Sequence, residues 1–265
     1  MNRELTIFVR LTVTIMTEFK VYNHILIQFF ASLAFAMLFA CSPENNPSVV
    51  QEMKAVDLGL SVKWAECNLG AEKPEDYGDY YAWGEVEPYY SSQDPLTWKY
   101  GKTGYDWTSY SLCNGKSSTL TKYNTSSSFG TVDNKTVLEE ADDVAHVKLG
   151  GKWRMPTDAE WTELRTNCTW TSENQNGVHG FLVTGPNGNS IFLPRAGSRS
   201  NTELNDVGSN GVGVYWSSSL DTNRPYYAWS VYLYYDPGER YDVVTRGDNG
   251  LYRYLGHSVR PVSNY

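Results

Sequence analysis

The stretch GGKWRMPTDAEWTELRTNC (residues 150–168) predicts the corner around which the chain folds. It is typical of a strand end, a sharp turn at Pro156 and a short helix that begins after Thr157. Thr157 and Glu160 have the spacing of a capping box, in which each side chain accepts a hydrogen bond from the other residue's amide. The residue before a proline avoids the helical region, so the helix cannot start earlier. Apolar side chains converge here and predict a packed core corner rather than a catalytic one: Trp153, Met155, Trp161, Leu164 and Cys168.

A second helix is expected directly before this corner, over residues 133–149. Thr136 and Glu139 again have capping-box spacing, and Gly150 supplies a left-handed stop. The apolar residues Leu138, Ala141, Val144 and Ala145 fall on one stripe.

Short strands are expected on both sides of the two helices. Residues 181–184 and 190–193 predict a β-hairpin through a turn at Gly185–Gly188. In residues 227–235, Trp229, Val231 and Leu233 are expected in the core, with Tyr232 and Tyr234 on the opposite face. The pattern predicts an α+β fold with antiparallel sheets. The other expected strands cover residues 55–71, 77–85 (with Trp83 in the core), 212–219 and 256–262.

The composition favours a loop-rich extracellular domain with an aromatic core. The chain has 20 Tyr and 9 Trp, and aromatics make up 14% of its 265 residues. Residues 86–128 form a long polar segment whose Tyr and Trp can pack it internally. The net charge of −8 argues against a nucleic-acid partner, which needs a basic face.

The N-terminal residues 1–40 predict a signal peptide outside the fold, with Met16 as an alternative start. The apolar run at 25–40 ends Leu38-Phe39-Ala40-Cys41, which resembles a bacterial lipobox, where cleavage precedes a lipidated Cys. Cys41 would then anchor the protein in the cell envelope, at the outer membrane, through its lipid chains. An ordinary secreted protein with a free Cys41 is the alternative. Residues 41–55 are expected to form a polar tether, and residues 56–265 one domain.

Several long motifs carry a family resemblance over nearly all of the mature chain. VDLGLSVKWAECNLGA, YGDYYAWGE, WRMPTDAEW, NGNSIFLP, YWSSS and GHSVRPV resemble the Fibrobacter succinogenes major paralogous domain family, found in lipoproteins and secreted proteins of Gram-negative gut bacteria. The resemblance implies a C-type-lectin-like domain, with short antiparallel strands, two short helices and long aromatic-rich loops. It also implies kinship with the formylglycine-generating enzymes, which share that fold.

Catalysis is not expected from the residues. The formylglycine-generating group uses a close Cys pair near the C-terminus, whereas no Cys follows Cys168 here, which leaves a degenerate relative as an alternative. Hydrolase, metalloprotease and phosphate-loop motifs are missing, and adjacent His257 and Ser258 do not make a catalytic pair. In an oxidising compartment Cys67 and Cys168 are the favoured disulfide, with Cys113 left over.

Ligand recognition is better motivated, because residues 205–253 are rich in Tyr, Trp, Asn, Asp and Ser. We expect tyrosine rings to stack on an extracellular glycan while nearby polar groups bind its hydroxyls. Display of a variable protein- or phage-binding surface is the competing interpretation. No cofactor is expected, although Asp242, Asp248 and Asn249 leave calcium open. The candidate ligand-binding residues are Asp221, Asn223, Arg224, Tyr232, Tyr234, Asp236, Arg240 and Asp242.

Overall fold

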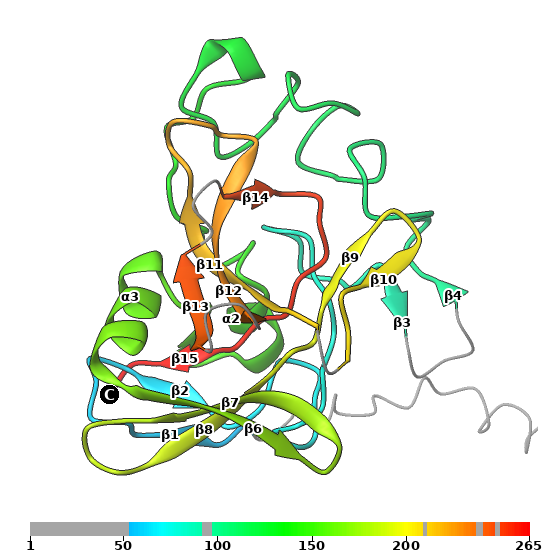
Figure 1. Ribbon diagram of the computed structural model, residues 1–265. Helices are drawn as coiled ribbons and strands as arrows, with labels where there is room; N and C mark the ends of the chain where they lie inside the picture. The colour runs from blue at the N-terminus through cyan, green and yellow to red at the C-terminus, as the bar shows by residue number, and fades with distance from the viewer. Residues whose placement is uncertain (1–52, 92–96, 209–210, 237–240, 247–249) are drawn as a thin grey trace, which may run out of the picture. The chain divides into compact units, whose positions relative to one another are not determined.

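The computed structural model describes residues 53–91, 97–208, 211–236, 241–246 and 250–265 (Figure 1). By compactness the chain divides into Met1–Val49 and Val50–Tyr265, and all the described residues belong to the second unit. The predicted leader and Cys41 therefore lie outside the described residues. Met53 is buried and Ala55 lies in the first strand, so the folded domain begins before the expected boundary at residue 56.

The first and last strands of the domain share one sheet. Its order is β1-β2-β15-β5, and every pairing is antiparallel. Val262 lies opposite Trp64 on one side and opposite Arg154 on the other. The sheet thus joins the beginning, the middle and the end of the domain. Its strands are β1 (Ala55–Val56), β2 (Lys63–Ala65), β5 (Trp153–Arg154) and β15 (Val262–Ser263).

Two other sheets are antiparallel and built mainly from consecutive strands. One has the order β6 (Thr169–Gln175), β7 (Val178–Thr184) and β8 (Ser190–Pro194). The other has the order β11 (Gly213–Leu220), β12 (Tyr227–Asp236) and β13 (Tyr241–Arg246), and β14 (Leu251–Tyr252) also pairs with β12. Two-stranded pairs are β3 (Tyr90–Ser91) with β4 (Thr97–Trp98), and β9 (Ser198–Ser200) with β10 (Glu203–Asn205).

The helices of the described residues are short, and the fold class is α+β as predicted. They are α2 (Val144–Leu149), α3 (Asp158–Asn167) and a 3₁₀ turn, η1 (Ser127–Phe129). The predicted hairpin is also confirmed, because Thr184 pairs with Ser190 and Phe181 with Leu193 across β7 and β8.

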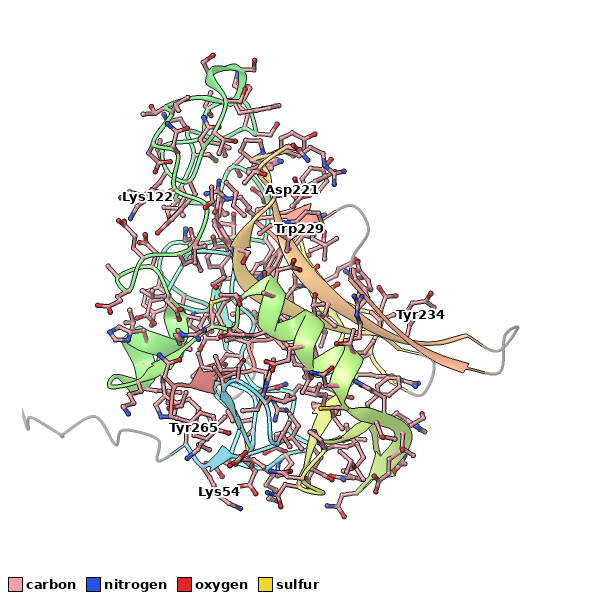
Figure 2. All side chains as sticks on the ribbon, turned by 90° about the vertical axis from the view of Figure 1, so that its left-hand side faces the viewer. Lys54, Lys122, Asp221, Trp229, Tyr234 and Tyr265 are labelled. Carbon is pink, nitrogen blue, oxygen red and sulfur yellow. The ribbon has the colours of Figure 1, made fainter. Side chains whose placement is uncertain are left out.

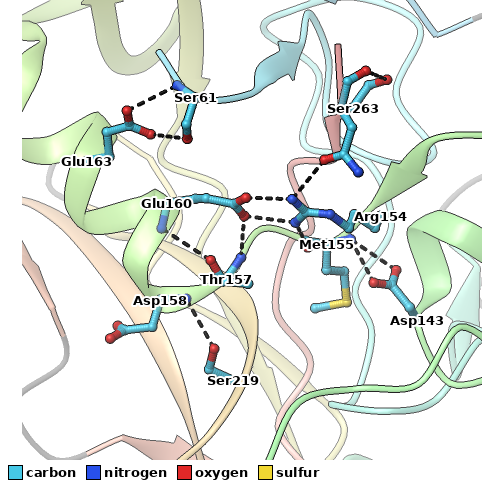
Figure 3. A network of polar contacts seen from close by, with 11 residues as sticks. Ser61, Asp143, Arg154, Met155, Thr157, Asp158, Glu160, Glu163, Ser219 and Ser263 are labelled. Carbon is cyan, nitrogen blue, oxygen red and sulfur yellow. Dashed lines mark hydrogen bonds and ion pairs between the residues drawn. The ribbon is translucent and has the colours of Figure 1, made fainter.

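The corner at residues 150–168 forms as the sequence predicts (Figure 3). The Thr157 hydroxyl accepts from the Glu160 amide at 3.2 Å, and the Glu160 carboxylate accepts from the Thr157 amide at 2.8 Å. Arg154 of β5 donates to both carboxylate oxygens of Glu160, at 2.8 and 2.5 Å. Burial alone would raise the pKa of Glu160, but the hydrogen bonds and charge of Arg154, together with the hydrogen bonds from Thr157, hold it below its usual value.

Trp161 of this corner and Trp83 from outside it both pack in the core beside β11. Trp161 is buried, with its ring centre 4.7 Å from that of Trp64 and 5.7 Å from that of Tyr215. Its indole donates to the Trp216 carbonyl at 3.1 Å, and the buried Trp83 donates to the Ser217 carbonyl at 2.8 Å. A buried indole N–H needs such a partner, so these bonds orient the rings against β11.

The predicted helix over residues 133–149 is wrong in its first half. The Leu138 amide donates to the Ser218 carbonyl at 3.0 Å, and the Leu220 amide to the Thr136 carbonyl at 2.8 Å. Pairing with the end of β11 therefore uses the backbone that the helix would need. The helix starts at Val144 instead, because the buried Asp143 carboxylate accepts from the first amides of α2.

Two predicted strands are mostly irregular, although their burial is as expected. In residues 55–71 the chain turns at Gly59, which has a φ of 76°, and only β1 and β2 are regular. Residues 77–85 make a single bridge from Tyr81 to His257, while Trp83 is buried as predicted. Of the expected last strand, residues 256–258 make isolated bridges and β15 begins at Val262.

The predicted inward face of β12 is right for Val231 and Leu233, and wrong for Trp229. Trp229 is half-buried, whereas its neighbours Ala228 and Ser230 are buried. The β11–β12 register shifts between Trp216 and Leu220, so the alternation changes phase along the strand.

The favoured disulfide is not present, since Cys67, Cys113 and Cys168 are all free thiols. The three side chains belong to different clusters of the core. Cys67 packs with Met53, Cys113 with Tyr110, and Cys168 against the Trp161 cluster. Burial raises the pKa of Cys168 to about 11, which keeps this thiol protonated and poorly reactive.

Candidate functional site

The sequence-predicted ligand residues fall into two groups along β12 (Figure 2). Asp221, Asn223 and Arg224 lie in the turn between β11 and β12, whereas Tyr232 and Tyr234 lie further along the strand. At about 3.3 Å per residue, a strand separates these groups by roughly 20 Å. For Asp236 and Asp242 the structure describes the backbone only. Arg240 lies outside the described residues.

Asp221 holds the turn together rather than presenting itself to a ligand. Its side chain is 1% exposed and accepts from the Asn223 amide at 3.0 Å and from Arg224 Nε at 3.0 Å. The Arg224 guanidinium in turn lies 4.9 Å from the centre of the Tyr227 ring. Arg224 and the exposed Asn223 are therefore the members of this turn that a ligand can reach.

Tyr232 and Tyr234 lie on the predicted face of β12 and are half-buried. Their neighbours Val231 and Leu233 point into the core. Burial, and then the negative charge of Asp206, raise the pKa of the Tyr232 hydroxyl. Part of this tyrosine pair is thus covered by the chain near Asp206.

A larger group of rings lies beside the Asp221–Arg224 turn, and we call it the aromatic surface. Tyr252 is 38% exposed, and the other rings are partly exposed. Tyr252 stacks on Tyr254 at 5.4 Å and meets Tyr227 edge-to-face at 4.7 Å. Trp107 lies 4.9 Å from Tyr254, and Phe129 lies 5.0 Å from Tyr226. The aromatic surface consists of Trp107, Phe129, Tyr226, Tyr227, Tyr252 and Tyr254.

Backbone pairing and a buried arginine fix these rings. Tyr227 lies opposite Tyr252 in the β12–β14 pair. Arg253, between the two stacked tyrosines in sequence, is fully buried. Its guanidinium donates at 3.0 Å to the carbonyls of Lys122, Tyr123 and Pro225, and at 2.9 Å to the Tyr110 hydroxyl. One side chain thus connects the loop that carries Trp107 and Phe129 to the strands that carry the tyrosines.

Hydroxyl contacts also restrict the rings. The hydrogen bond with Tyr252, followed by burial, raises the pKa of Tyr227 to about 12. The aromatic surface is therefore an array of rings held by contacts with one another and edged by the Arg224 guanidinium. A rigid array loses little conformational entropy on binding.

The sequence interpretation found the turn of this site but missed its rings. Tyr226 and Tyr227 come before the residues of β12 that the alternating pattern singled out. Tyr252 ends the two-residue strand β14, and Tyr254 lies in the turn that follows it. The repeat of Tyr at positions 252 and 254 was the available signal, because two tyrosines this close in sequence can stack on one another, as they do here. Nothing local places Trp107 or Phe129 beside them, because Arg253 makes that connection through the fold.

The described residues do not assemble a catalytic group around His257. His257 and Ser258 are buried, and the His257 ring lies 4.3 Å from the Trp216 ring. Burial lowers the pKa of His257 to about 3, so this imidazole is neutral. These two residues therefore form part of the buried core.

The described residues contain no group of three or more His, Cys, Asp or Glu placed to hold a metal ion. Within the same residues, every helix is too short or too polar to cross a membrane. Asp248 and Asn249, two of the three residues that left calcium open, lie outside the described part of the chain.

Comparison with family models, curated proteins and solved structures finds no match to this chain.

Proposed function

We propose that this domain recognises an extracellular carbohydrate, without catalysis, through the aromatic surface. The observation that carries the proposal is the set of partly exposed, mutually oriented rings around Tyr252. Sugar rings have one or two faces of C–H groups that pack on aromatic rings, while hydroxyls bind polar neighbours. Arg224 and Asn223 supply such neighbours at one edge of the aromatic surface.

A glycan array probed with the purified full-length chain tests this proposal. Tyr252→Ala and Tyr254→Ala each remove a partly exposed ring, and we expect binding about tenfold weaker in each case. Tyr265→Ala is the matched control, because Tyr265 is 56% exposed and belongs to a different surface. The proposal is contradicted if all three variants lose glycan affinity equally. It is also contradicted if Tyr252→Ala and Tyr254→Ala both bind the glycan as tightly as wild type.

Protein binding is the second candidate function. Tyr, Trp and Arg are also the residues that dominate protein interfaces; the aromatic surface supplies Tyr and Trp, and Arg224 lies at its edge. This function, and the display-scaffold interpretation with it, would be favoured by two results together. The glycan array would show no binding, and a purified protein ligand would bind wild type but not Tyr252→Ala.

We further propose a C-type-lectin-like fold and a cell-envelope location. The family resemblance supports the fold, as do the small antiparallel sheets and the two short helices. The lipobox-like Cys41 supports anchoring at the outer membrane. Labelling with a palmitate analogue tests the anchor, since label on the wild-type chain and none on Cys41→Ala is expected. Equal label on both would end this part of the proposal.

A further inference from the structure

Arg199, the central residue of β9, lies with its side chain between two tyrosine rings. Its backbone is held on both sides, because it pairs with Leu204 of β10 and exchanges two hydrogen bonds with Gly256, at 2.8 and 2.9 Å. The guanidinium carbon lies 4.1 Å from the centre of the Tyr90 ring and 5.2 Å from that of Tyr80. The residue is 6% exposed, so this cation is held in place almost entirely out of water.

Two other buried arginines show what the Arg199 guanidinium lacks. Arg253 donates to three carbonyls and a phenol, and Arg260 donates to three carbonyls and the side-chain oxygen of Asn68. Among the described residues, none accepts a hydrogen bond from the Arg199 side chain, and no carboxylate pairs with it. The tyrosine faces attract its charge but do not satisfy its in-plane N–H groups. A buried guanidinium without acceptors is costly, and an anion would supply them.

The outer end of the Arg199 side chain is the part that a ligand can reach. Its Nε is enclosed and has no acceptor, whereas the two terminal nitrogens are not enclosed by the part of the chain that the structure describes. Tyr90, the nearer of the two rings, is only half-buried, so the stack reaches the surface of the domain. A guanidinium that stacks through its face keeps its in-plane N–H groups for a partner. The fork of the two terminal nitrogens matches a carboxylate, which it can bind through two parallel hydrogen bonds.

Charge and neighbouring rings select the kind of anion. One guanidinium balances one negative charge, which suits a carboxylate better than a phosphate group that carries nearly two. The exposed Glu203 of β10 lies next to Leu204 and therefore on the opposite face of the β9–β10 pair from Arg199. Trp98, also half-buried, meets Tyr90 edge-to-face at 5.2 Å. Partly exposed aromatic rings thus lie beside the cation, and the C–H face of a sugar packs on such rings.

We propose that Arg199 binds the carboxylate of an acidic sugar of the hexuronic class, whose ring packs against Tyr90 and Trp98. The carboxylate supplies the acceptors and the negative charge that the buried guanidinium lacks. None of these three residues belongs to the aromatic surface. The proposal therefore does not rest on the function proposed for that surface.

Saturation-transfer NMR on the full-length chain at pH 7, with glucuronic acid and its methyl ester as probes, tests the proposal. The ester keeps the sugar ring but has no charge, so we expect it to bind about tenfold more weakly than the acid. This comparison needs no variant. Arg199→Lys keeps a charge but loses the planar fork, and should weaken binding of the acid about tenfold. Arg165→Lys, in the last turn of α3, is the matched control and should bind as wild type does.

Four results would overturn the proposal. Equal binding of the acid and the ester would show that no ion pair forms. Binding lost in Tyr252→Ala and kept in Arg199→Lys would assign the sugar to the aromatic surface. Tighter binding of N-acetylalanine than of glucuronic acid would make the ligand a peptide carboxylate. Absence of binding to wild type would leave Arg199 a structural residue, and binding gained in Asp94→Asn would then identify Asp94, which lies outside the described residues, as its counter-ion.

Discussion

The guanidinium of Arg253 lies 4.9 Å from the centre of the Trp83 ring, behind the aromatic surface. Both side chains are fully buried. A buried cation is costly unless its donors are satisfied, and here three carbonyls, a phenol and an aromatic face surround it. This arrangement links the stability of the core to the geometry of the candidate site.

Replacing Arg253 by Lys should therefore cost stability and ligand binding together. Lysine keeps the charge but cannot reach four acceptors from one planar group. We expect Arg253→Lys to lower the free energy of unfolding by about 3 kcal/mol, measured by urea denaturation. Arg224→Lys, at a half-buried position, is the control and should cost less than about 1 kcal/mol. Similar effects of the two changes would argue against the structural role of Arg253.

The capping box of α3 gives a second prediction. Thr157→Ala removes the hydroxyl that accepts from the Glu160 amide, and should lower the free energy of unfolding by about 1 kcal/mol. Thr166→Ala, on the same helix, removes a hydroxyl that bonds only within its own turn, and should cost less than about 0.5 kcal/mol. Equal losses would mean that the cap contributes nothing.

The lowered pKa of Glu160 predicts the pH dependence of its contribution. A carboxyl whose folded pKa is depressed stabilises the protein above its unfolded value, 4.5, and this contribution is lost as the pH falls through the folded pKa. Glu160→Gln should therefore be less stable than wild type at pH 7, by about 1 kcal/mol given partial exposure, and the difference should shrink as the pH falls from 4.5 to 3. Urea unfolding at the two pH values measures the difference, and a gap that widens in acid would contradict it.

Gly130 gives a prediction about the loop that carries Phe129. Its φ is 126°, and an added Cβ would lie 2.2 Å from the Leu120 carbonyl oxygen. Gly130→Ala should cost more than about 2 kcal/mol and shift the Phe129 ring. Gly115→Ala is the control that has backbone strain without a steric clash, because Gly115 has a φ of 83° and open space around it. We expect this substitution to cost about 1 kcal/mol. Comparable losses would show that the contact with Leu120 is unimportant.

The three free thiols of the described residues predict the behaviour of the protein under reduction. We expect the intact masses of Cys67→Ser and wild type each to be unchanged by reductant, because no described pair is bridged. A gain of the mass of two hydrogen atoms on reduction of wild type, absent in Cys67→Ser, would show that Cys67 forms a disulfide after all.

Local signals predicted those parts of the fold that local physics determines. The capping box at Thr157, the β7–β8 hairpin and the burial of Trp83 depend on spacing, turn residues and hydrophobicity within a few positions. The helix expected from residue 133 failed because pairing with β11, a segment distant in sequence, used its backbone. Trp229 was misplaced because a register shift cannot be read from alternation alone.

The candidate site was predictable only in part for the same reason. The turn at Asp221–Arg224 is local and its polar residues were visible, whereas the aromatic surface gathers rings from three separate segments. The buried Arg253 that gathers them carries no local signal, since a charged residue in a turn is ordinarily assigned to the surface.

The sheet shared by the first and last strands has a consequence for presentation. Lys54 and Tyr265 lie together at one end of the domain, while Asp221 and the β14 segment lie at the other, as both views show (Figures 1 and 2). Under the proposed anchoring at Cys41, the described domain would be held from the end that carries Lys54, and β14 with its Tyr252 lies at the opposite end. Copies held side by side would meet a repetitive polymer at many points at once, so contacts that are weak singly would retain it by avidity.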